Sequence, residues 1–181
     1  DISSSTTEMS DYLWSVLVKM YQNRYGADAQ PSAERPIHIA AWYLTHAHSD
    51  HFSAFAKLLK THGTDGSIVM DYMIGNFPDT YSIFSNMDWS DPDDYIAGIQ
   101  NAMPGGFTFL KVHTGQKIYL ANLELEVLAT YEDHLPYRII NTNDTNTVIR
   151  ITVNNKDALP GTVAPTILIL GDSWRYTSRI L

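Results

Sequence analysis

The spacing of apolar side chains predicts two helices and a strand in the first third of the chain. Residues 8–25 have apolar side chains three and four positions apart, which is typical of an amphipathic helix, and Gly26 is suited to end it. Residues 37–45, IHIAAWYLT, form an apolar run that is too short for a helix, so we interpret them as a buried strand. Residues 52–63 again have helical spacing and end at Gly63.

A second strand, a third helix and then a series of strands are predicted further along. Residues 67–74 form another apolar run, residues 77–91 a loop or short helix, and a third helix begins at Asp91 with an acidic first turn and ends near Met103. The remaining strands are separated by Gly, Asn and Pro and cover 107–113, 117–120, 123–130, 147–153 and 166–170. This order predicts one layered α/β domain, residues 1–181, with a mixed sheet.

The composition fits a single globular domain of 181 residues, of which 44% are hydrophobic. No apolar run reaches the length of about 18 residues that a membrane span needs, so we expect none. The start, DISSSTTEMSDY, lacks the basic residues and apolar stretch of a signal peptide. Because the chain does not begin with Met, we interpret it as processed or as a piece of a longer protein.

The charge and the absence of cysteine restrict the chemistry. The net charge is −8 and the 12 Lys and Arg residues are scattered, so we expect no strong nucleic-acid-binding surface. Without cysteine there are no thiolate ligands, and any metal site must be built from imidazole and carboxylate groups. Neither the compartment nor the oligomeric state follows from the composition.

Residues 45–51, THAHSDH, place three of the seven histidines and one carboxylate directly after the first predicted strand. A loop at the end of a strand is where open α/β sheets place ligand sites. We predict that His46 and His48 bind one metal ion and that Asp50 and His51 bind a second ion nearby. Zinc suits these ligands, as do iron and manganese. The alternative is a polar turn in which Asp50 caps the following helix.

The segment WYLTHAHSDHFSAF, residues 42–55, resembles the HxHxDH signature of the metallo-β-lactamase superfamily. TILILGDS, residues 166–173, is similar to the later strand of that family, which ends in Gly-Asp. The segments between the two motifs resemble a subset that includes the hydrolase domain of competence DNA-uptake channels and many uncharacterised bacterial hydrolases. The resemblance covers residues 37–172 and implies an αββα layered sandwich with mixed sheets.

The resemblance also implies a mechanism and a set of metal ligands. Two zinc ions would activate a water molecule as the nucleophile, Asp50 would orient or deprotonate this water, and Asp172 would bridge the ions. The family has its third histidine near Ala129 to Tyr131, where this chain has none. We therefore predict that His134 is the displaced ligand, with Asp133 or Tyr131 as alternatives.

The family's first hairpin, its last helices and the final histidine of the second metal site have no counterpart here, so the fold is expected to be truncated at both ends. Weak second-site binding and poor activity are expected to follow. The leading hypothesis is a metal-dependent, binuclear zinc hydrolase acting on a small molecule or a phosphodiester, while lactams, lactones, thioesters and other esters stay open. The rival hypothesis is a non-catalytic binding or scaffold module of the same fold.

Overall fold

The computed structural model describes residues 2–46, 48–78, 92–103, 105–134, 142–155 and 161–173. The chain divides into two compact units, each assembled from segments that are distant in sequence. Unit 1 contains residues 1–43, 48–74 and 90–110, and unit 2 contains residues 44–47, 75–89 and 111–181. The prediction of one domain over the whole chain stays a prediction.

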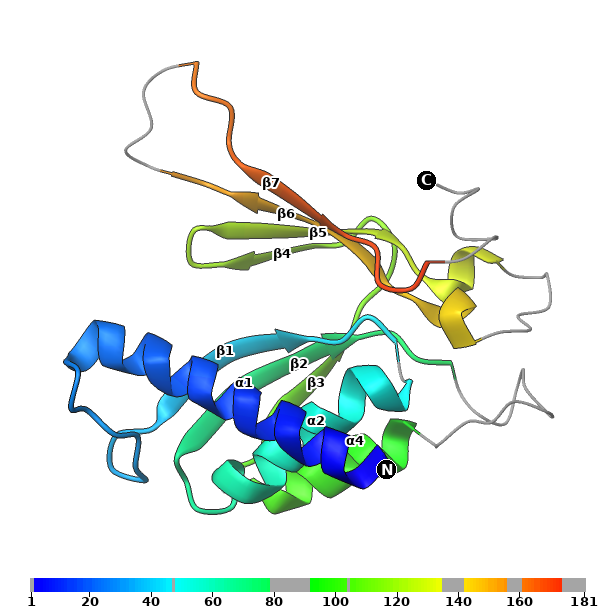
Figure 1. Cartoon of the computed structure of the whole chain (residues 1–181). Helices are drawn as coiled ribbons and strands as arrows, with labels where there is room; N and C mark the ends of the chain where they lie inside the picture. The colour runs from blue at the N-terminus through cyan, green and yellow to red at the C-terminus, as the bar shows by residue number, and fades with distance from the viewer. Residues whose placement is uncertain are drawn as a thin grey trace. The chain divides into compact units, whose positions relative to one another are not determined.

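Unit 1 consists of helices packed on one face of a three-stranded sheet (Figure 1). Its helices are α1 (Ile2–Tyr25), α2 (Ser49–Leu58), a π-helical turn (Leu59–Gly63) and α4 (Pro92–Ala102). Its strands are β1 (Ile37–Tyr43), β2 (Ile68–Gly75) and β3 (Thr108–Lys111), of which the last residues of β2 and β3 fall in unit 2. β1 is parallel to β2, with Ile37 opposite Ile68, and the strand order is β1-β2-β3.

The core of unit 1 is apolar and dense. Phe55 from α2 stacks on Trp42 from β1, with ring centroids 3.9 Å apart. The sequence prediction for α2 began at Phe52, whereas the helix begins at Ser49 because His48 is extended and ends the preceding loop. The fully buried large side chains of this core are Phe55, Leu58, Leu59, Ile68, Met73, Ile74 and Ile99.

Unit 2 is an antiparallel sheet with the strand order β4-β5-β6-β7 (Figure 1). The strands are β4 (Lys117–Leu120), β5 (Leu123–Ala129), β6 (Val148–Val153) and β7 (Thr166–Ile169). One short 3₁₀ helix, Tyr131–His134, follows β5, and another, Thr142–Thr145, precedes β6. Alternate residues of β5 are buried from Leu125 onward, which fits the alternation of Leu125 and Val127 with glutamates in its sequence.

The prediction of an α/β chain with parallel and antiparallel strands is confirmed, but the strands form two sheets instead of one mixed sheet. The turn after β3 explains the division, because Gly115 and Gln116 exchange backbone hydrogen bonds of 2.9 Å with Val127 of β5. This pairing commits β4 to the second sheet. Residues 79–91, most of the predicted 77–91 loop, lie outside the described residues. No described helix is long and apolar enough to cross a membrane.

Candidate metal centre

The loop that follows β1 is anchored inside unit 2. Leu44 and His46 are buried, and the His46 side chain is fully covered. The backbone N–H of Thr147, just before β6, donates a hydrogen bond of 2.8 Å to the carbonyl oxygen of Thr45. The Thr45 hydroxyl lies 3.0 Å from Nδ1 of His46. A hydrogen bond at Nδ1 orients the imidazole ring.

The end of β7 approaches the same loop through a glycine. Gly171 has a φ of +57°, a left-handed conformation that L side chains adopt rarely. A Cβ atom at this position would also lie 2.9 Å from Cβ of Thr45 and would overlap the side-chain oxygen of Asn146. Glycine is therefore required here for two independent reasons. It allows the strand end, and with it Asp172, to lie against Thr45 and Asn146.

His46, His48 and Asp172 form a group in which one ligand atom from each side chain lies within 4.8 Å of the others. His46 and Asp172 belong to the same unit, and His48 follows His46 by two positions in the same loop. Neighbouring ligands of a tetrahedral zinc ion with bonds of about 2.0–2.2 Å lie about 3.3–3.6 Å apart. Side chains whose ligand atoms lie within 4.8 Å could reach this spacing by moving closer by up to about 1.5 Å. Two imidazoles and a carboxylate suit zinc, so the donor set fits the predicted metal.

Asp50 and His51 lie in the first turn of α2 and are not members of this group. The Asp50 carboxylate is 77% exposed and lies 3.7 Å from Nε2 of His51. The alternative interpretation of Asp50 as a helix cap is not observed, because His48 is the N-cap residue and no side chain caps the helix. A carboxylate in the first turn does complement the helix dipole.

The three candidates for the displaced ligand lie together on the 3₁₀ helix after β5, and none of them belongs to the metal group. Asp133 is engaged structurally, because Oδ2 accepts hydrogen bonds from the Thr130 backbone N–H at 2.8 Å and the Thr114 hydroxyl at 2.5 Å. Tyr131 is buried beneath Lys111, whose Nζ lies 5.9 Å from the ring centroid. His134 is buried and close enough to Asp144 to influence its charge.

A buried polar cluster, defined as Thr130, His134, Asp144 and Asn146, lies where β5 ends and β6 begins. Asp144 is 1% exposed, and neither of its carboxylate oxygens accepts a hydrogen bond. Burial raises the pKa of Asp144, and the nearby imidazole of His134 offsets part of that rise. Such a carboxylate is costly unless a proton or a cation neutralises it.

Residues 141–146, NTNDTN, have the composition of a surface loop, so the sequence did not predict this cluster. The available signal was the accumulation of Asn, Asp and Thr directly before a strand with an apolar start. Polar residues at such a position are ordinary in a surface turn. Only the packing of this segment against Thr45 and Gly171 shows that they are buried.

The remaining histidines have ordinary partners. His38 lies 2.9 Å from Asp71, and His113 lies 2.7 Å from Glu132; both histidines are exposed. His62 stacks on Trp14 with a centroid separation of 3.6 Å.

Comparison with models of known protein families finds no match, and comparison with curated proteins finds no match either. The described residues define only a class: an α/β protein in which β1 is parallel to β2, the sheet β4-β5-β6-β7 is antiparallel, and a His-His-Asp group could hold a metal ion. The family resemblance rests on the residues of the two motifs.

Proposed function

We propose that this protein is a metal-dependent hydrolase and that zinc is its metal. The observation that carries the proposal is the group formed by His46, His48 and Asp172, whose ligand atoms lie within 4.8 Å of one another. Two imidazoles and one carboxylate are a donor set of catalytic zinc sites, which keep one position open. Asp172 reaches the group only because Gly171 lets the end of β7 approach the loop. The motif resemblance supports the same assignment.

Each of the three ligands contributes something different. His46 is fully buried and is oriented by Thr45, so it would be the fixed ligand. His48 is half-buried and Asp172 is exposed, so these two would leave one side of the site open to a substrate. A bound zinc ion would lower the pKa of water and stabilise negative charge on a substrate oxygen. Asp50, exposed at the start of α2, would orient the attacking water or accept its proton.

The proposal extends to a second, weaker zinc site. In it, Asp50 and His51 would supply ligands and Asp172 would be shared, as the family resemblance implies. Their side chains lie 3.7 Å apart at the start of α2 and outside the group of three, which is why we propose weaker binding there. His134 would complete the first site. The proposed fold is the αββα sandwich, and the proposed substrate class is phosphodiesters, because the matched subset favours it.

A second candidate function is metal binding without catalysis. The observation that favours it is that only three of the six predicted ligands are grouped among the described residues. Such a protein would bind zinc through His46 and Asp172 but would not turn over substrate. Metal content and hydrolysis must therefore be measured separately.

The test begins with zinc content and affinity in the wild type, His46→Ala and Asp172→Asn. We expect about one tightly bound zinc ion per chain in the wild type and a loss of affinity of at least about tenfold in either variant. The matched control is His113→Ala, which removes an exposed histidine outside the group and should leave zinc affinity unchanged. Unchanged affinity in both ligand variants would reject the metal site.

Hydrolysis is then measured at fixed zinc on a phosphodiester, an ester and a β-lactam. We expect the phosphodiester to be hydrolysed, and Asp50→Asn to lower kcat by about 10²–10⁴-fold with the tighter zinc site retained. Zinc binding without turnover on any substrate of the panel would favour the non-catalytic module. Strong lactam hydrolysis with an inert phosphodiester would retain the enzyme and reject the substrate class.

A further inference from the structure

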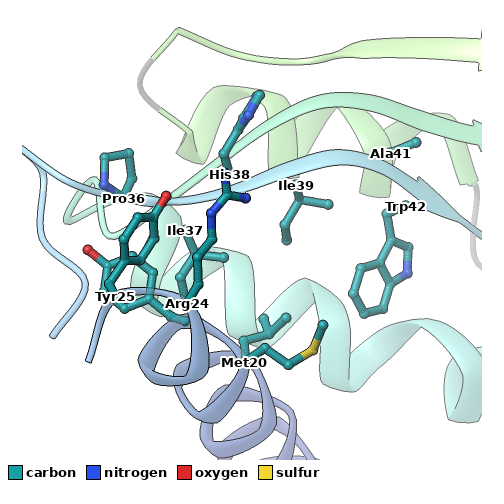
Figure 2. A pocket seen from close by; sticks show the side chains of 11 residues that line it. Met20, Arg24, Tyr25, Pro36, Ile37, His38, Ile39, Ala41 and Trp42 are labelled. Atoms are coloured by element: carbon teal, nitrogen blue, oxygen red, sulfur yellow. The ribbon is translucent and has the colours of Figure 1, made fainter. Parts of the chain in front are cut away.

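A pocket of about 400 Å³ lies between α1 and β1, entirely within unit 1 (Figure 2). Its volume falls within the range of small-molecule sites, and most of its lining is apolar or aromatic. Figure 2 shows Ile39 and Trp42 extending from β1 toward the helices, with Met20 on α1 below them. Met20 is 63% exposed at the pocket, so its side chain is accessible to a ligand.

One charged side chain in the pocket lacks an acidic partner. Arg24 ends α1 and lines the pocket, and no carboxylate of the described residues lies within 4.0 Å of its guanidinium. The exposed cations Lys111, Lys117 and Arg150 each pair with a glutamate, whereas Lys19, Lys57 and Lys60, like Arg24, have no carboxylate partner among the described residues. Arg24 is exposed, so its guanidinium can receive an anion from solvent.

A second arginine adds to the positive charge at this end of the pocket. The guanidinium carbon of Arg24 lies 5.4 Å from the ring centroid of Tyr25, and that of Arg35 lies 4.1 Å from the same centroid. Among the described residues, Arg35 has no carboxylate partner either. His38 also lines the pocket, but its Nε2 is engaged by Asp71 at 2.9 Å. Arg24 is thus the lining side chain best able to receive an anion.

We propose that this pocket binds a small amphiphilic carboxylate. The carboxylate would accept paired hydrogen bonds from Arg24, and the apolar body would lie against Met20, Ile39 and Trp42. A ligand without an anionic group would not pair with the charge of Arg24. An anion without an apolar body would leave the apolar lining exposed to water. At about 30 Å³ per small group, as for water, the pocket holds about a dozen non-hydrogen atoms. Medium-chain fatty acids and aryl carboxylates have this size.

The pocket is separate in composition from the proposed metal centre, because none of its lining residues is a candidate metal ligand. The proposal therefore holds or fails independently of the hydrolase function. Binding of the carboxylate should be the same in the zinc-loaded and zinc-free protein.

The test is calorimetric titration with octanoate, 1-octanol and acetate as probes. We expect octanoate to bind measurably, and octanol and acetate to bind at least about tenfold more weakly, since each lacks one half of the recognition. Arg24→Gln should weaken octanoate binding by about tenfold or more, and Arg24→Lys by less, because lysine keeps the charge but loses the paired geometry. Met20→Ser should weaken octanoate and octanol alike.

The matched control is Lys19→Gln, which removes one positive charge from an exposed position of the same helix outside the pocket lining. It should leave octanoate affinity unchanged, and a thermal melt of each variant checks that it is folded. Three outcomes would overturn the proposal: no binding at millimolar octanoate, equal binding of octanol and octanoate, or an equal loss in Lys19→Gln and Arg24→Gln.

Discussion

The interiors of the two units differ in chemistry: that of unit 1 is largely apolar, whereas that of unit 2 buries polar and charged side chains beside its apolar ones. In unit 1, Phe55, Leu58 and Leu59 of the α2 segment pack against strands with almost no exposed surface. In unit 2, Asp144 and Asn146 are just as deeply covered. Burial of the first set stabilises the fold in proportion to area, whereas burial of the second set opposes folding unless each polar group is satisfied. This buried polar cluster lies beside the loop that carries His46.

The apolar interior should show the largest effect on stability. Phe55→Ala removes a ring that is 1% exposed and stacked on Trp42, so we expect a loss of about 3–5 kcal/mol in the free energy of unfolding. Urea denaturation measures this loss. Val16→Ala on the more exposed face of α1 is the control and should change stability by less than about 1 kcal/mol. Equal losses in the two variants would show that the interior of unit 1 is not packed as described.

The contact between β7 and the loop after β1 should show the next largest effect. Gly171→Ala adds a methyl group against Thr45 and Asn146 at a positive φ, so we expect a loss of about 1–3 kcal/mol and weaker zinc binding. Gly161→Ala separates the two causes, because Gly161 also has a positive φ but has no atom within 4 Å of the added Cβ. The Gly161→Ala variant should lose less stability than Gly171→Ala and should bind zinc with wild-type affinity. Retained zinc affinity in Gly171→Ala would contradict the role given to this approach.

Burial of the polar cluster should lower the stability of the fold, by an amount that depends on pH. The folded protein raises the pKa of Asp144, so the ionised carboxylate opposes folding above that pKa. In zinc-free protein at pH 7, Asp144→Asn should therefore increase the free energy of unfolding by about 1 kcal/mol, which urea denaturation measures. The gain should disappear as the pH falls below the ordinary aspartate pKa of about 3.9, where both states are protonated. A wild type that is more stable than Asp144→Asn at pH 7 without zinc would refute this assignment.

The smallest effect should come from the exposed charges of the antiparallel sheet. Arg150 lies opposite Glu126 in the register of β5 and β6 and forms an ion pair with it. Because the pair faces solvent, Arg150→Gln should cost less than about 1 kcal/mol at low salt and almost nothing at high salt. Unfolding at two salt concentrations checks this. A large, salt-independent loss would mean that the Arg150 side chain contributes packing as well as charge.

The secondary structure was predictable because each element has its own local signal. The alternation of Leu123, Leu125 and Val127 with glutamates marks β5, and the structure places this strand at Leu123–Ala129. Errors arose at the ends, where local signals compete. α1 begins at Ile2 instead of residue 8. The serines and threonines of residues 3–7 are compatible with a helix, but their helix propensity is too low to predict one. The separation into two sheets depended on backbone pairing between residues 115–116 and Val127, which no local pattern encodes.

The candidate site was predictable only in part. The spacing of His46 and His48 after an apolar strand indicated a metal-binding loop, and the Gly-Asp at residues 171–172 was identified through the family resemblance. The structure groups these three side chains. The assignments of Asp50, His51 and His134 stay predictions. Asp144 was missed because its burial arises from contacts between segments that are far apart in the chain.

The sequence by itself determined the apolar periodicity of each element and the chemistry that its side chains can offer, since both are properties of short segments. It therefore determined that a metal site must use imidazole and carboxylate groups, and that His46 and His48 would lie near each other. The tertiary structure decided which distant segments meet: that Asp172 joins the two histidines, that Asp144 is buried near His134, and that Arg24 lines an apolar pocket. Such meetings depend on strand pairing and close packing over the whole chain, which no single segment specifies.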